Sequence, residues 1–302
     1  MQGYRIDRSV KPPSTRGMHR LGVMAALCCA SVSGCGHRAI PYVARVRETR
    51  GVLISVAAWG PDSQRLDHAV AAALDSAAAV ETALAGVSDR PGTQGVSPGV
   101  AQLVLRAVEL ARASGGAFDP TAKNYRGLAV DTARHTVALP RGLHLDLGEL
   151  GRGYALDRAL AALHGATDSA VVSSGGQYLI HSDWSGARVI GIVDPDHTMV
   201  PLVRLTIPPG TWAVSTMSVA EARDEIIDPR TGKPATRTRV VAAMAPSAAD
   251  AGGWSAAFYV VGCDSALVLA PRVHTSVVCI DDDVRWSADL EGRVMRDTMR
   301  ER

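Results

Sequence analysis

A long stretch of helical periodicity, flanked by clusters of short apolar segments, limits this chain to few kinds of fold. From Gln64 to Leu84, apolar residues recur at the spacing of one helix face. A second helix is predicted to begin at Ser97-Pro98, a good N-cap followed by a proline, and to end at Gly115-Gly116. Strands in clusters around such helices favour an α+β fold with a single domain over a regular strand–helix alternation.

The expected strands are short and apolar. Residues 51–60 predict one strand, and residues 143–163 predict a strand, a glycine turn and a helix. Further strands are predicted from "AVVSSGGQYLI", "ARVIGIVDP", "PLVRLTI", "RTRVVAAMAP" and "HTSVVCIDD". Hydrophobic residues make up 47% of the chain but aromatic residues only 4%, so we expect a core built mainly from alanine, valine and leucine.

The N-terminus has the pattern of an export signal. Basic residues up to Arg20 precede the apolar run "LGVMAALCCASVSG", which is too short to span a bilayer as a mature helix. The sequence "VSGC" that ends at Cys35 is similar to a bacterial lipobox, in which the cysteine becomes the lipidated N-terminus. The alternative is an ordinary signal peptide with a chance cysteine. Met18 is an alternative start, because the segment that follows it is a complete signal by itself.

The excess of positive charge lies in this N-terminal segment. The whole chain has a net charge of +2 at pH 7, and residues 35–302 alone carry about −2. We find no basic stripe interleaved with aromatic residues, so we expect no nucleic-acid partner. The sequence thus predicts a signal peptide at 1–34, a tether at 35–44 and one folded domain at 45–295. We expect an exported protein, anchored by lipid to the membrane and facing the periplasm.

The five cysteines leave one pair to explain. Cys28 and Cys29 belong to the signal, and Cys35 is the expected lipid site. Cys263 and Cys279 either form a disulfide, which an exported compartment permits, or remain two buried thiols. Their spacing predicts no metal site.

Three stretches rich in glycine have the features of a ligand site. They are "SGGAFDPTA" (114–122), "DLGELGRGYALD" (146–157) and "SSGGQ" (173–177). Glycine lets the backbone come close to a ligand, and a helix that begins after glycine offers N–H groups to an anion. Each stretch alone is also typical of an ordinary turn.

Taken together and in this order, the stretches resemble the FAD:protein FMN transferase (ApbE-like) family. The resemblance includes "IIDPRTGKPA" (226–235) and "ADAGGWSAAFYVVG" (249–262), and it covers roughly residues 45–290. It implies a T-fold-related α+β domain that binds FAD with a divalent metal, usually Mg²⁺. The reaction that it implies is transfer of FMN to a threonine of a target protein in the envelope. Such phosphoryl transfer needs positioning, neutralisation of charge and a base for the incoming hydroxyl.

The resemblance assigns residues to FAD. It implies that the cofactor is bound by Ala117, Phe118, Asp119, Asp146, Arg152 and Ile226. Arg152 stands where the family often has lysine, and a cation suits a position near phosphates. For Asp146 and Asp157, capping of a turn or helix is the structural alternative.

The metal positions implied by the family are altered in this chain. The family's acidic ligand falls on Gly252 and its threonine ligand on Ala256. The candidate substitutes are Glu149, Ser255 and Asp250. Asp250 lies two residues early, which on a helix turns its side chain by about 200° to the far face, whereas in a loop it could reach the site.

The family's histidine, in the role of base, falls on Glu225, which is either a base with a raised pKa or a solvated acid. These changes leave three hypotheses open. The first is a working transferase, the second an FAD-binding pseudoenzyme that does not cleave FAD, and the third a structural lipoprotein of the envelope.

Overall fold

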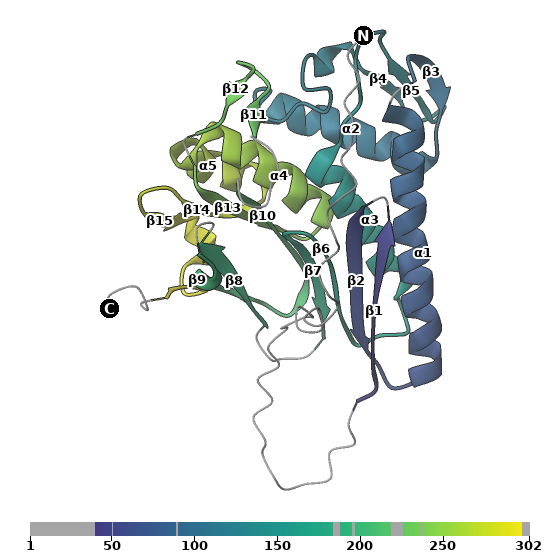
Figure 1. The fold of residues 1–302 in the computed structure, drawn as a ribbon, viewed down its shortest axis with the longest axis vertical. Helices are drawn as coiled ribbons and strands as arrows, with labels where there is room; N and C mark the ends of the chain where they lie inside the picture. Colours follow the sequence, from purple (N-terminus) through teal and green to yellow (C-terminus); the bar gives the residue numbers. More distant parts are fainter. Residues whose placement is uncertain are drawn as a thin grey trace, which may run out of the picture. The chain divides into compact units, whose positions relative to one another are not determined.

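An eight-stranded antiparallel sheet lies at the centre of the fold, with the strand order β1-β2-β6-β7-β10-β13-β14-β15 (Figure 1). Its strands are β1 (Tyr42–Thr49), β2 (Val52–Trp59), β6 (Ser169–Ser174), β7 (Gln177–Ser182), β10 (Gly210–Ser218), β13 (Val240–Ala245), β14 (Ser276–Ile280) and β15 (Val284–Trp286). The computed structural model describes residues 40–49, 51–88, 90–183, 188–194, 197–218, 226–236 and 238–297. All of these belong to one unit that begins at Ile40.

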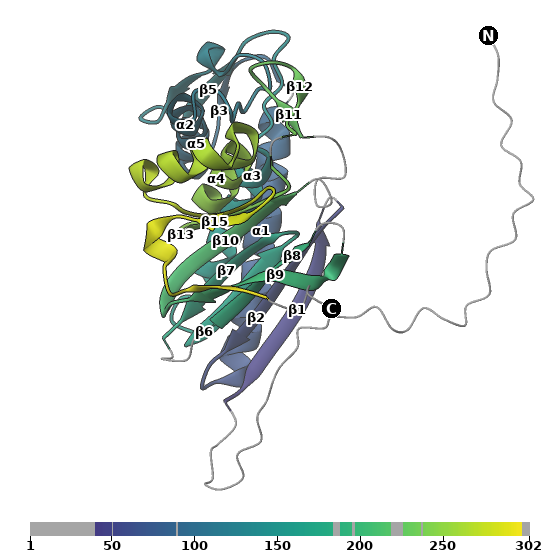
Figure 2. The ribbon, with the colours of Figure 1, turned by 90° about the vertical axis from the view of Figure 1, so that its left-hand side faces the viewer.

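Three small sheets complete the strands. The first contains β8 (Arg188–Asp194), β9 (His197–Ile207) and β16 (Val294–Arg296); the second β3 (Gly92–Gly95), β4 (Ala129–Asp131) and β5 (Thr136–Leu139); the third β11 (Ile227–Asp228) and β12 (Lys233–Pro234). The sheet of β8, β9 and β16 packs on one face of the large sheet through Ile192, Val203 and Leu205 (Figure 2).

The helices cover the other face of the large sheet (Figures 1 and 2). They are α1 (Ser63–Ser88), α2 (Pro98–Ala113), α3 (Gly148–Ala162), α4 (Ala248–Val261) and α5 (Cys263–Leu269), with short 3₁₀ turns at Tyr125–Gly127, Ala270–Val273 and Ala288–Leu290. The predicted α+β class is therefore confirmed. Strand β1 begins at Tyr42, within the segment predicted as a tether.

The two helices predicted from periodicity and capping are confirmed. Helix α1 buries Leu66, Val70 and Leu74 against the sheet and α3. It is also the one helix of the described residues that is long and apolar enough to cross a membrane, and one of its faces packs in the core. Helix α2 is capped by Ser97, whose Oγ accepts from the N–H of Val100 at 3.3 Å.

The strand predicted at the start of residues 143–163 is wrong. Residues 143–147 belong to no strand. Their backbone is held by isolated bonds instead, from Leu145 N–H to the Ser88 carbonyl at 3.0 Å and from Asp146 N–H to the Pro120 carbonyl at 2.7 Å. The helix predicted after them is confirmed as α3.

Helices α3 and α4 pack with almost no space between their backbones. A Cβ atom on Gly153 would lie 2.0 Å from the Ala248 carbonyl oxygen, and one on Gly252 would lie 2.2 Å from the Glu149 carbonyl oxygen. Only glycine permits this approach. The "GG" of the 249–262 stretch therefore serves helix packing.

Asp157 of α3 caps the N-terminus of α4, which is the structural role weighed for it above. Its carboxylate accepts from the N–H groups of Ala248 and Ala249, at 2.7 and 3.0 Å, and from the hydroxyl of Ser247 at 2.9 Å. This cap satisfies N–H groups that have no partner within the helix. It also fixes α4 against α3.

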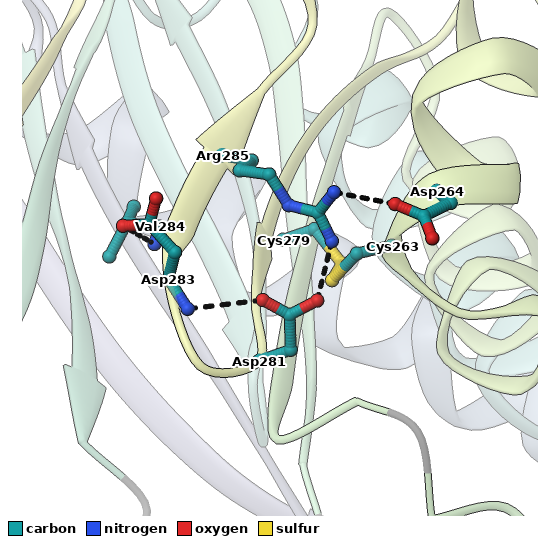
Figure 3. The surroundings of a disulfide bond; sticks show 7 residues. All are labelled: Cys263, Asp264, Cys279, Asp281, Asp283, Val284 and Arg285. Atoms are coloured by element: carbon teal, nitrogen blue, oxygen red, sulfur yellow. Dashed lines mark hydrogen bonds and ion pairs between the residues drawn. A yellow bond between two sulfur atoms is a disulfide. The ribbon is translucent and has the colours of Figure 1, made fainter.

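Cys263 and Cys279 form a disulfide that joins α5 to β14 (Figure 3). Of the two alternatives left open by the sequence, the structure thus has the disulfide. Beside it, Arg285 of β15 pairs with Asp264 at 2.6 Å and with Asp281.

Candidate functional site

A cavity of about 640 Å³ lies where several parts of the fold meet. Its walls are the start of α3, the turn between β6 and β7, and the loops around residues 117–122 and 226–229. Strands β8 and β10 and the second half of α4 complete it. Cavities of this size are typical of small-molecule sites, which span ~300–1,000 Å³.

The residues predicted to bind the cofactor come together in this cavity. Its lining includes Ala117, Phe118, Asp119, Asp146, Arg152 and Ile226, together with Glu149. The first and the last of them, Ala117 and Ile226, are more than a hundred residues apart in the chain. The fold therefore gathers the motifs that were separate in the sequence.

Asp119 shapes the loop that forms one wall. One carboxylate oxygen accepts from the N–H and the hydroxyl of Thr121, both at 2.7 Å, and the other accepts from the N–H of Tyr125 at 3.1 Å. Phe118, just before it, is almost fully buried. Asp119 thus positions the wall mainly through its hydrogen bonds to the loop.

The start of α3 lies beside the cavity, which Gly148 and Glu149 line. Asp146 Oδ1 accepts from the N–H of Gly148 at 2.9 Å, and Gly148 has a φ of +48°, which favours glycine. This turn is the capping role weighed as the alternative for Asp146. The positive end of a helix beside a cavity favours a bound anion.

Glu149 and Arg152 form an ion pair one turn into α3. Arg152 Nη1 donates to Glu149 Oε1 at 2.6 Å. The side-chain amide of Gln177 donates to Glu149 Oε2 at 2.6 Å and to the Glu149 carbonyl oxygen at 2.8 Å. Both oxygens of the Glu149 carboxylate therefore have a donor already.

The structure does not bring Asp250 or Ser255 into the cavity. Asp250, in the first turn of α4, pairs with Arg106 of α2 at 2.7 Å. Ser255 is fully buried, where its hydroxyl donates to the Gly252 carbonyl oxygen at 2.8 Å and bonds Ser215 at 2.9 Å. Because each residue of a helix is rotated by about 100° from the last, Asp250 and Ser255 lie on other faces of α4 than Ala256, which lines the cavity.

The described residues hold no group of three His, Cys, Asp or Glu side chains that could bind a metal ion. At Gly252, where the resemblance puts an acid, an added Cβ would also lie 2.7 Å from Gln177 Nε2. The metal-ligand set predicted as Glu149, Asp250 and Ser255 is therefore not assembled.

Two residues in or beside the cavity were not singled out from the sequence. Tyr178 of β7 contributes an aromatic ring to the lining, and Gln177 holds Glu149 in place. Their position directly after Gly175-Gly176 in the "SSGGQ" stretch was the available signal. Glu225, the predicted base, lies outside the described residues and remains a prediction.

Fold and site together define an α+β protein with a ligand cavity at the start of a helix. The profile of the ApbE family matches residues 122–280. The chain belongs to the ApbE family.

Two relatives are FAD:protein FMN transferases. The one from Treponema pallidum (strain Nichols) is 29% identical, over 91% of this chain and 95% of its own. The one from Buchnera aphidicola subsp. Schizaphis graminum (strain Sg) is 27% identical, over 46% of this chain and 44% of its own.

Solved structures share the fold. The ApbE protein of Thermotoga maritima MSB8 has a TM-score of 0.73 at 21% identity, over 83% of this chain and 99% of its own. The flavin transferase ApbE of Vibrio cholerae has a TM-score of 0.69 at 18% identity, over 84% and 99%. These likenesses support the same α+β fold for this chain.

Proposed function

We propose that this protein is an FAD:protein FMN transferase. The observation that supports this function most directly is the cavity, in which all six predicted cofactor residues meet. The relative from Treponema pallidum, matched along nearly its whole length, supports the same activity. The target is a protein, and by resemblance its acceptor is a threonine.

The proposed reaction replaces a phosphoanhydride bond by a phosphate ester. The bond from the FMN phosphorus atom to the oxygen that bridges the two phosphates breaks, the same phosphorus atom forms an ester with the acceptor hydroxyl, and AMP leaves with the bridging oxygen. The proton of that hydroxyl passes to a base, for which Glu225 is the candidate. Stabilisation of the transition state in phosphoryl transfer depends mainly on positioning and on charge. Among the described residues, the start of α3 and Arg152 are therefore the main contributors to this stabilisation.

Magnesium is implied by the resemblance, but the donor groups present do not fit it. The carboxylate of Glu149 is held by Arg152 and Gln177, and Ala256 presents a methyl group to the cavity. Hard cations take oxygen ligands, and the described residues bring no group of three His, Cys, Asp or Glu side chains together to hold one.

AMP release tests the function. The full-length chain is incubated with FAD and a threonine-containing acceptor protein, and AMP is measured by chromatography. In-gel flavin fluorescence of the acceptor is recorded from the same sample. We expect AMP and fluorescent acceptor in equal amounts. FAD binding without AMP would instead favour the pseudoenzyme, for which the glycine at 252 and the alanine at 256 are the supporting observation. Absence of both binding and AMP would reject the transferase.

We also propose that the protein is exported and anchored in the envelope by lipid on Cys35, with a flavinylated target there. The support is the order of basic, apolar and small residues that ends at Cys35. The disulfide between Cys263 and Cys279 is typical of an oxidising compartment.

A further inference from the structure

Arg152 is placed to meet a phosphate group. Its side chain is about one-third exposed and lines the main cavity. It also lines a second cavity of about 220 Å³ beside it, together with Asp146 and Gly148. The guanidinium group lies against the turn between β6 and β7, where a Cβ on Gly175 would be 3.3 Å from Arg152 Nη1. A ligand that extends along the start of α3 therefore meets this group.

The space beside Arg152 is closed to a carboxylate from α4. At Gly252, any side chain would collide with the backbone of Glu149 and with the amide of Gln177, and the first of these is not free to move aside. The close packing of α3 against α4 therefore leaves no room for an acidic side chain at position 252. Replacement of a single residue does not restore a ligand there.

Glu149, the acid whose backbone lies against Gly252, already has partners for its carboxylate. One carboxylate oxygen of Glu149 accepts from the guanidinium of Arg152 and the other from the amide of Gln177. A metal ion that bound Glu149 would have to displace both donors and face the guanidinium at close range. Like charges at such a distance repel.

We propose that Arg152, rather than a divalent cation, holds the diphosphate of the nucleotide in this cavity through its remaining N–H donors, so that the chain binds FAD without metal. This inference rests on the proposed function. Glu149 and Gln177 act as positioning residues that hold the guanidinium in place. An arginine has five N–H groups in a planar fork, so the bond from Nη1 to Glu149 leaves donors for phosphate oxygens.

Calorimetric titration of FAD into the full-length chain tests this inference, once in EDTA and once with excess Mg²⁺. We expect dissociation constants that agree within about twofold. Binding that requires Mg²⁺, or is at least tenfold tighter with it, overturns the inference and leaves the proposed function standing. No binding in either buffer overturns both. This comparison uses the native chain and does not depend on the folding of a variant.

Substitutions then assign the role to Arg152. Arg152→Ala should weaken FAD binding in EDTA by at least about tenfold, since it removes the hydrogen bonds from a charged donor to the phosphate oxygens. Arg152→Lys should weaken FAD binding less than Arg152→Ala, because lysine keeps the positive charge but lacks the planar array of N–H donors. The matched control is Arg158→Ala, on the same helix but outside this cavity, and it should leave FAD binding unchanged. An unchanged affinity in Arg152→Ala would overturn the inference.

Glu149→Gln separates the two roles of the carboxylate. If Glu149 positions Arg152 and competes with phosphate for it, this variant binds FAD in EDTA as tightly as the native chain or more tightly. If Glu149 is a metal ligand, Mg²⁺ increases the FAD affinity of the native chain but not that of the variant. The second result would contradict the inference.

Discussion

Gly153 of α3 lies directly against the carbonyl oxygen of Ala248 at the start of α4, so that an added Cβ would be 2.0 Å from that oxygen. Gly153→Ala must therefore push the two helices apart. We expect a loss of about 1–3 kcal/mol in the free energy of unfolding, the usual cost of overpacking. Urea denaturation followed by circular dichroism measures it.

The control for this change is Gly86→Ala, on the exposed side of α1, where an added Cβ meets nothing within 4 Å. Alanine is the better helix former by about 0.5–1 kcal/mol, so this variant should be more stable than the native chain. A Gly153→Ala variant as stable as native would show that the contact is looser than described.

Gly252→Asp returns a carboxylate to the position that the family resemblance assigns to a metal ligand. We expect it to destabilise the protein by at least ~2 kcal/mol, since the new side chain meets the Glu149 carbonyl oxygen and Gln177. We expect no gain of Mg²⁺-stimulated AMP release. Gly86→Asp should change stability by less than about 1 kcal/mol. A stable Gly252→Asp variant that gains metal dependence would contradict our account of the site.

Asp157 makes the stability of the fold depend on pH. Burial raises the pKa of Asp157 above its usual value, although the N–H groups of Ala248 and Ala249 act against this. Between the unfolded pKa, near 3.8, and the higher folded pKa, the folded chain binds more protons than the unfolded chain. The stability that Asp157 contributes is therefore complete below the unfolded pKa and falls as pH rises through the folded one.

Asp157→Asn removes this titration. The stability of the native chain relative to the variant should fall from pH 4 upward and become constant above the folded pKa, as measured by urea denaturation at a series of pH values. Asp131 provides a control of opposite sign: hydrogen bonding from the Arg134 N–H lowers its pKa. Relative to Asp131→Asn, the native chain should lose stability as pH falls. If the stability of the native chain relative to Asp157→Asn instead rose with pH, the raised pKa of Asp157 would be refuted.

Cys35 is the expected lipid site, and its substitution tests the proposed location. Cys35→Ser should release the protein from the membrane fraction or leave an uncleaved precursor, because no thiol is left for lipid. Membrane fractionation and intact mass measure both. Cys29→Ser, which keeps the lipobox, should fractionate like the native chain. Membrane attachment of Cys35→Ser with a cleaved signal would contradict lipidation at this residue.

Local patterns in the sequence predicted the elements well. The helix of residues 64–84 follows from the spacing of its apolar residues, and α2 follows from Ser97 and the proline after it. Residues 143–147 were misread as a strand because an apolar run does not say whether a partner strand lies beside it. Pairing depends on distant parts of the chain, here Ser88 and Pro120.

The candidate site was predicted as a set of residues but not as a geometry. Resemblance of motifs placed Phe118, Asp146 and Arg152 in one cavity. It did not show that Gly252 lies against Glu149, because that distance depends on how two helices pack. The pair of Asp250 with Arg106, 144 residues away, was beyond reach for the same reason.

The disulfide contributes stability that reduction should remove. Cys263 and Cys279 are 16 residues apart, and closing a loop of that size in the unfolded chain is worth about 3 kcal/mol. For a domain of this size, that lowers the melting temperature by roughly 6–12 °C in dithiothreitol. The variant Cys263→Ala/Cys279→Ala should melt at the temperature of the reduced chain and should not respond to the reductant. An equal response of both proteins to dithiothreitol would mean that the effect arises elsewhere. Since both sulfur atoms are buried, the samples should be equilibrated with reductant in denaturant and refolded before the scan.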